Sequence, residues 1–247
     1  MAGHSHWAKI KRAKGANDKK RGKFWSKIAR KIIIAAKAGG GDPGANLTLR
    51  YTIEEAKAAN MHKDTIANAI KKGTGELGAE NYEPITYEGY APGGVALLVE
   101  SLTNNRTRTV AEVRKIFEMH GGNLAVAGSV AFQFVKQGVV TVKADAPGVT
   151  EDGLMEVALD AGAEDVKNQG EVFEVITTPV TYLKVKDAIE AARVPVEAGE
   201  ITYMPTNTVA VDAEKAATLL KLIDALEDND DVQTVSHNAE LPESVGV

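Results

Sequence analysis

The chain has 247 residues, of which 44% are hydrophobic and 26% charged, with no cysteine and a formal net charge of -5. This length exceeds the roughly 100 to 200 residues of a typical domain, so two or three domains are expected. Without cysteine, disulfides, Cys-ligated zinc and thiol catalysis are excluded, and no apolar run approaches the ~20 residues of a membrane span, so a cytoplasmic protein with no membrane partner is predicted.

The charge is distributed very unevenly along the chain. Residues 1–79 contain 17 lysines or arginines and 6 acidic residues, a net charge of +11, whereas the remaining 168 residues contain 12 basic and 28 acidic residues, a net charge of -16. Such asymmetry predicts a polyanionic partner at the N-terminal end.

The first 79 residues are predicted to form a basic arm and a three-helix bundle. Residues 1–22 show no apolar periodicity and are rich in Lys, Gly and Asn, which is typical of a mobile arm. A helix is then predicted with an apolar face of Phe24, Ile28, Ile32 and Ala35 and a basic face of Lys20, Lys23, Lys27 and Arg30. The segment GGGDPG (39–44) ends it.

Two further short helices complete this bundle. The apolar residues of the second are Leu49, Ile53, Ala56 and Ala59, and those of the third are Ile66, Ala69 and Ile70. Gly73 is predicted to end the third helix.

Beyond residue 80 the apolar residues alternate, which indicates strands. A hairpin is predicted around Gly93 and Gly94, followed by a helix over 106–120 and a strand at VAFQFV (130–135). Residues 136–204 then predict strand, helix (150–161), strand (164–167), strand (172–176), helix (182–193) and strand (196–204). This β-α-β-β-α-β order is the ferredoxin-like unit.

Residues 206–247 are too few to close a core of their own, with one helix (213–227) and one strand (231–236). They would supply the second helix and last strand that residues 80–134 lack. The predicted fold is therefore α+β and multidomain: a three-helix domain (1–79), a discontinuous ferredoxin-like domain (80–134 with 206–247), and a third, ferredoxin-like domain (135–205) inserted in the second.

Basic residues at phosphate-neutralising density predict a nucleic-acid interface in the N-terminal region, although a solvated, solubilising tail is the alternative. The candidate contacts are His4, His6, Trp7, Lys9, Lys11, Arg12, Lys14, Lys19, Lys20, Arg21, Lys23, Lys27 and Arg30. Trp7 is a candidate for stacking on a base. Trp25 shares a helix face with Ala29 and Ile33, which favours packing in the core.

A second candidate site is a phosphate site formed by Asn104, Asn105, Arg106 and Arg108. Thr103 or Asn104 is expected to cap the helix that follows, and the two arginines lie in or beside its first turn, where cations are unfavourable by ~0.3 to 1 kcal/mol each. A compensating anion is therefore expected, either a bound phosphate or the acidic third domain.

No catalytic residues, metal or cofactor are predicted. The chain has no phosphate-binding loop, dinucleotide fingerprint or nucleophile elbow, and His4 and His6 alone are too few for a zinc site. The acidic run from Glu227 to Asp231 lacks the glycine and closing glutamate of a calcium loop, which favours a solvated helix end.

Several segments resemble the YebC family of bacterial regulators, whose mitochondrial relatives are translational activators. They are AGHSHWAKIKRAKGANDKKRGKFWSKIARKI, AKAANM, AIKKGTG, YEGYAPGGVALLVESLTNNRTRTVAEVRKIF and GGNLAVAGSVAFQF. The resemblance implies a helical domain followed by two α+β domains, and a non-enzymatic role in gene expression. That role is described for some members as transcriptional control on DNA and for others as help to ribosomes, including those stalled on proline-rich sequences.

Three functions remain open on the sequence. A Lys-rich arm on a small bundle suits the phosphates of rRNA or tRNA and favours a ribosome-associated translation factor, because RNA is recognised largely by shape and backbone. A DNA-binding transcriptional regulator is the alternative, and a protein-binding scaffold with an acidic body is the third. The protein is expected to act as a monomer.

Overall fold

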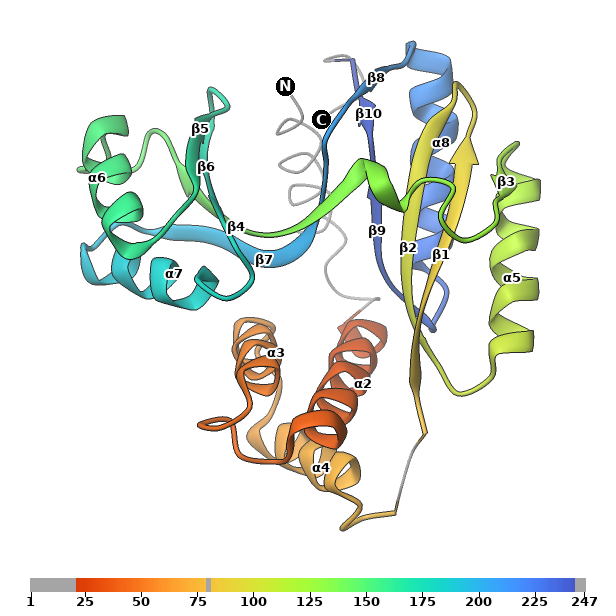
Figure 1. The fold of residues 1–247 in the computed structure, drawn as a ribbon, viewed down its shortest axis with the longest axis horizontal. Coiled ribbons are helices and arrows are strands. Elements are labelled where there is room, and N and C mark those ends of the chain that lie inside the picture. Colours follow the sequence, from red (N-terminus) through yellow and green to blue (C-terminus); the bar gives the residue numbers. More distant parts are fainter. Residues whose placement is uncertain (1–20, 79–80, 243–247) are drawn as a thin grey trace.

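The computed structural model describes residues 21–78 and 81–242. A helical domain lies beneath two antiparallel sheets, each covered by helices on one face (Figure 1). The mixed α+β fold, with the third domain inserted in the second, confirms the predicted architecture. Among the described residues, no helix is long and apolar enough to cross a membrane.

The helical domain consists of α2 (Arg21–Gly39), α3 (Leu47–Ala58) and α4 (Lys63–Thr74). Their predicted apolar faces meet in one core, in which Ile28, Ile32 and Leu49 are almost completely buried. Asn46 caps α3 by accepting a hydrogen bond from the amide of Leu49. The same side chain donates to the carbonyl oxygens of Ala35 and Gly40, so it also fixes the turn that follows α2.

The prediction that Gly73 ends the third helix is wrong. This residue lies inside α4, and Gly75 takes the C-cap position with a positive φ of 88°. Gly73 is where α4 crosses α2: a Cβ atom there would lie 2.5 Å from the carbonyl oxygen of Ile33 and 2.7 Å from the Cβ of Ala36. The glycine therefore permits close contact between two helices.

We expect Gly73→Ala to destabilise the protein by about 1 to 3 kcal/mol because the added methyl group must push the two helix backbones apart. Thermal unfolding of the full chain measures this. Gly22→Ala is the matched control, since a Cβ at Gly22 meets nothing within 4 Å and alanine favours the helix. Equal stabilisation by both substitutions would contradict the close crossing.

The first sheet has the strand order β3-β1-β2-β9. Its long strands β1 (Glu83–Ala91) and β2 (Val95–Thr103) form the predicted hairpin, which turns at Gly93 and Gly94. After β2 come α5 (Arg106–Met119) and the short β3 (Asn123–Leu124). The other edge is β9 (Val232–His237), which pairs with β2 and follows α8 (Ala213–Glu227).

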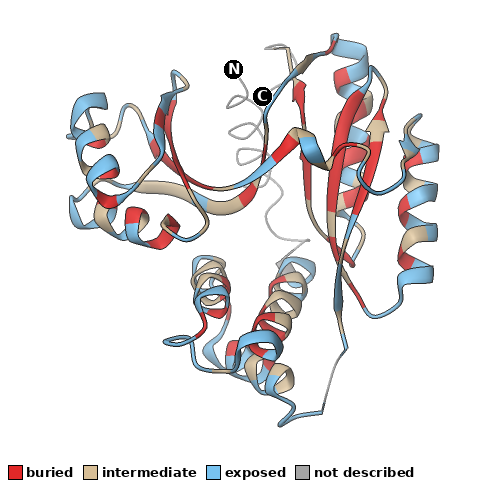
Figure 2. Cartoon of the chain, in the orientation of Figure 1, coloured by how far each residue is buried: buried red, intermediate tan, exposed pale blue. Residues whose placement is uncertain are grey.

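Both helices pack on one face of this sheet, where Phe117 of α5 and Leu222 of α8 are fully buried with Leu97 and Val99 of β2 (Figure 2). The short strands β8 (Val209–Ala210) and β10 (Ala239–Glu240) pair in parallel beside it.

The inserted domain contains β4 (Phe134–Lys143), α6 (Glu151–Ala161), β5 (Asp165–Asn168), β6 (Val172–Thr177), α7 (Tyr182–Ala191) and β7 (Val196–Pro205). Its sheet has the order β5-β6-β4-β7, with α6 and α7 packed on one face. The first sheet has the equivalent spatial order, but the strand corresponding to β6 is β1, which precedes the others in the chain. Strands β4 and β7 form the connection between the two sheets. The domain boundaries near residues 79, 134 and 205 remain a prediction.

The predicted strand over 130–135 is wrong in its first part, which forms a short 3-10 helix, Ala131–Gln133, before β4 begins. The cause is the buried carboxylate of Glu88, which accepts hydrogen bonds from the amides of Gly128, Val130 and Ala131 at 2.6 to 2.8 Å. Burial opposes ionisation of this group, but these three amides outweigh it and lower the pKa of Glu88. Backbone amides turned toward one carboxylate cannot continue a strand ladder.

Candidate nucleic-acid interface

The predicted nucleic-acid contacts fall into two groups. His4, His6, Trp7, Lys9, Lys11, Arg12, Lys14, Lys19 and Lys20 lie outside the described residues, as does most of the predicted arm. Arg21 is the first residue of α2, and Lys23, Lys27 and Arg30 follow on the same helix. We call these last three residues the basic face of α2.

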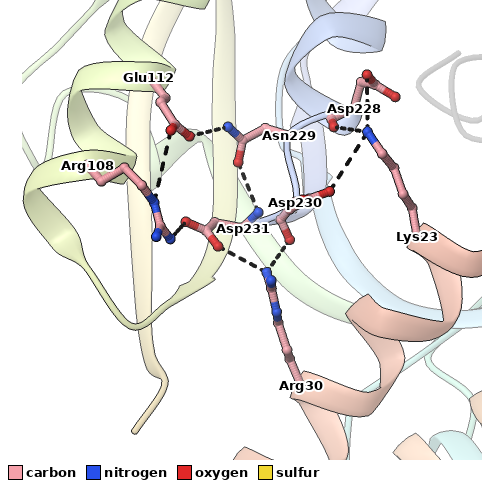
Figure 3. Close-up of a pocket in the computed structure, with 8 residues that line it drawn as sticks. All are labelled: Lys23, Arg30, Arg108, Glu112, Asp228, Asn229, Asp230 and Asp231. Carbon is pink, nitrogen blue, oxygen red and sulfur yellow. Dashed lines mark hydrogen bonds and ion pairs between the residues drawn. The ribbon is translucent and has the colours of Figure 1, made fainter. Parts of the chain in front are cut away.

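In the structure this basic face lies against the end of α8 and the segment that follows it (Figure 3). We call that segment, Asp228 to Asp231, the acidic loop. Lys23 donates to the carbonyl oxygen of Asp228 at 3.1 Å and lies 3.4 Å from its carboxylate. The C-terminal end of a helix carries partial negative charge, so both the end of α8 and the carboxylate of Asp228 favour a cation at this position.

Lys27 is less exposed than Lys23, the other lysine of the basic face. It donates a hydrogen bond to the carbonyl oxygen of Glu227. Burial lowers the pKa of Lys27 to about 8, although the carboxylates of Glu227, Asp230 and Asp228 act in the opposite direction. Lys27 thus exchanges contacts with water for a contact with the C-terminal end of α8, which carries partial negative charge.

Asp231 is the centre of the contact and is only 3% exposed. One carboxylate oxygen accepts from Arg30 at 3.0 Å, and the other accepts from Arg108 at 2.6 Å and from the hydroxyls of Thr109 at 2.7 Å and Thr103 at 3.2 Å. Burial would raise the pKa of Asp231, but the hydrogen bonds from Arg108 and Thr109 and the two guanidinium charges lower it. This carboxylate is therefore held in its charged form.

The acidic run was predicted to be a solvated helix end, and for Asp231 this is wrong. A single sequence gives no sign that a carboxylate after α8 meets arginines from α2 and α5. The side chains of Asp228 and Asp230 stay 54% and 67% exposed, so only the last residue of the loop is buried.

At the start of α5, Asn105 is the N-cap, since its side chain accepts from the amide of Arg108 at 3.1 Å. Thr103 and Asn104, the predicted caps, take other partners: the amide of Asn105 and the guanidinium of Arg108. The anion expected at this helix start is Asp231, supplied by the chain itself. It comes from beyond residue 205 rather than from the third domain, and the phosphate site remains a prediction.

Arg106 differs from Arg108. Its side chain is 68% exposed, and its Nε lies 3.8 Å from the carboxylate of Glu83. It therefore retains an accessible guanidinium at the start of α5.

Trp25 packs as expected for a core residue. Its indole N–H donates to the carbonyl oxygen of Ala59 at 3.0 Å, and its ring meets that of His62 edge to face. The described part of the chain contains no cluster of three or more histidine or acidic side chains able to hold a metal ion.

Between the basic face and the acidic loop lies a hollow of about 440 Å³. The residues that line it are Lys23, Arg30, Arg108, Glu112, Asp228, Asn229, Asp230 and Asp231 (Figure 3). The side chains of Asn229 and Glu112 are hydrogen bonded to each other across it at 2.8 Å. Its charged groups are largely paired with one another.

Comparison with known proteins shows the family to which this chain is similar. Residues 5–76 match the family model of the TACO1/YebC protein N-terminal domain, and residues 82–239 match that of the TACO1/YebC second and third domain. The chain belongs to the TACO1/YebC family. This confirms the resemblance seen in the sequence.

Similar TACO1/YebC proteins match along nearly their whole length. A probable transcriptional regulatory protein of Acidithiobacillus ferrooxidans is 53% identical over 98% of this chain and 95% of its own, and one of Carboxydothermus hydrogenoformans is 50% identical over 98% and 99%. The crystal structure of a conserved hypothetical protein from Aquifex aeolicus is similar with a TM-score of 0.81 and 47% identity, covering 92% of this chain and 93% of that one. These relatives support a YebC-type regulator.

Proposed function

We propose that this protein is a non-enzymatic regulator of gene expression that acts in the cytoplasm and binds nucleic acid through the phosphate backbone. The observation that carries the proposal is the charge asymmetry, a net +11 in residues 1–79 against -16 in the rest of the chain. Lysine and arginine contacts to phosphates supply affinity without reading the base sequence.

The packing of α2 supports backbone binding over sequence reading by this helix. A recognition helix presents one free face to the major groove. The apolar face of α2 is buried in the helical core, and its basic face is occupied by the acidic loop. This leaves the Lys-rich residues 1–20 as the main candidates for phosphate contacts.

Ribosomal RNA or tRNA is the first candidate target, because folded RNA offers dense phosphates and is recognised largely by shape. In that role the protein is a ribosome-associated translation factor that relieves stalled translation, for example on proline-rich sequences. The names of the relatives favour a second candidate, transcriptional regulation on DNA.

The salt dependence of binding tests the proposal. Replacing Lys9, Lys11, Arg12 and Lys14 with glutamine is expected to weaken binding and to reduce the slope of log K against log salt by ~0.9 per lost contact on duplex DNA, or ~0.7 on single strands. The matched control replaces four exposed lysines of the acidic body, Lys143, Lys167, Lys184 and Lys221. A slope that is unchanged in the first variant would refute phosphate binding by the arm.

Sedimentation of gently lysed cells separates the two targets. Comigration with ribosomes that resists DNase, falls as salt is raised and is lost in the arm variant would support the translation role. Release by DNase, with no protein on ribosomes, would instead favour transcription.

A further inference from the structure

The cations of α2 that suit a phosphate backbone already have anionic partners within the chain. Lys23 contacts Asp228 and lies 3.8 Å from the carboxylate of Asp230, while Arg30 donates to the carbonyl oxygen of Asp230 and to the carboxylate of Asp231. Carboxylate and carbonyl oxygens thus follow the basic face along the helix, much as phosphate oxygens follow one another along a nucleic-acid strand (Figure 3).

We infer that the acidic loop is a built-in competitor of nucleic acid, which occupies the basic face of α2 and must be displaced before phosphates can bind there. This inference rests on the proposed function. A lysine or arginine that holds a carboxylate at hydrogen-bond distance cannot hold a phosphate in the same geometry, so the two anions exclude each other.

The contacts differ in a way that suits such exchange. The Lys23 side chain is 48% exposed and faces carboxylates that are more exposed still, and exposed ion pairs are weak and screened by salt. Asp231, in contrast, is buried and held by Arg108, Thr109 and Thr103. The loop is therefore anchored to the second domain at Asp231, while the ion pairs of Lys23 with Asp228 and Asp230 are exposed and weak.

The exchange also has a structural consequence. The acidic loop belongs to the second domain and the basic face to the helical domain. A polyanion that binds Lys23 and Arg30 therefore loosens the contact between these two domains. Arg30 has a second contact there, with its guanidinium 5.2 Å from the centre of the Tyr82 ring. Nucleic-acid binding is thereby coupled to the position of the helical domain.

The full chain carrying Asp228→Asn and Asp230→Asn tests the inference. Both side chains are exposed, so the fold is expected to persist, and circular dichroism checks it. The probes are a short duplex DNA and a short RNA hairpin, titrated separately. We expect about three- to tenfold tighter binding than wild type, because two competing surface ion pairs are removed.

The matched control is Glu156→Gln with Asp160→Asn, which changes the net charge equally on the exposed side of α6. Tighter binding by the loop variant than by this control supports competition. Equal binding by wild type, control and loop variant refutes competition while leaving the proposed function intact. An equal gain in both variants also refutes it, since general electrostatics then suffices. If none of the three proteins binds either probe, both the inference and the proposed function fail.

Discussion

Replacing Asp231 with alanine is expected to lower the free energy of unfolding by about 3 to 5 kcal/mol, because Arg30, Arg108 and the buried hydroxyls of Thr103 and Thr109 lose the buried acceptor that they share. Chemical denaturation measures the loss, and hydrogen exchange of the α5 amides reports it locally. The control is Asp228→Ala, which removes the exposed ion pair with Lys23 and should cost about 0 to 1 kcal/mol. Equal losses in the two variants would show that Asp231 is not the anchor.

The effect of Asp231 should also depend on pH. The pKa of Asp231 is lowered in the folded protein, so its contribution is fully present above the pKa of an unfolded aspartate and is lost as the pH falls through the folded value. Wild type should therefore lose stability in acid more steeply than Asp231→Ala. Parallel acid profiles would contradict the pairing with Arg30 and Arg108.

Replacing Glu174 with glutamine is expected to stabilise the inserted domain at pH 8 by about 3 kcal/mol and to have little effect near pH 4. Glu174 of β6 is fully buried, one carboxylate oxygen has no hydrogen-bond partner, and burial raises its pKa from 4.5 to about 7. Because the folded value is above the unfolded value, wild-type stability falls as the pH rises from about 4.5 through about 7. Glutamine removes that charge.

Hydrogen exchange of the β4 and β6 amides against pH is the measurement for Glu174, because it reports this sheet separately from the other domains. The control is Glu156→Gln, on the exposed surface of α6. Superimposable pH profiles for wild type and Glu174→Gln would show that Glu174 ionises freely.

Local patterns in the sequence predicted most elements of the fold. The helix over 213–227 has the predicted bounds, since an Asp cap precedes an unbroken apolar stripe. The β-α-β-β-α-β order and the insertion also followed, because strand and helix periods differ sharply. The misses came from long-range contacts: Gly73 lies within a helix because of what it touches on α2, and residues 130–133 leave the strand because of Glu88.

The site was only partly predictable for the same reason. Spacing correctly placed Lys23, Lys27 and Arg30 on one face of α2 and identified the need for an anion at the start of α5. Neither pattern contains the information that one carboxylate, Asp231, would serve both, since it lies about 200 residues beyond Arg30 in the chain. Pairings across such separations depend on how the domains close, which a charge pattern does not encode.

The insertion also sets an order for folding as the chain emerges from the ribosome. Strand β2 pairs with β9, with Leu97 opposite His237, so the first sheet lacks an edge strand and the α8 half of its core until nearly all of the chain has been made. The inserted domain has all its strands by residue 205. Domains fold as units during synthesis. The inserted domain can therefore complete its core while the earlier β1–β2 hairpin still has an exposed apolar face.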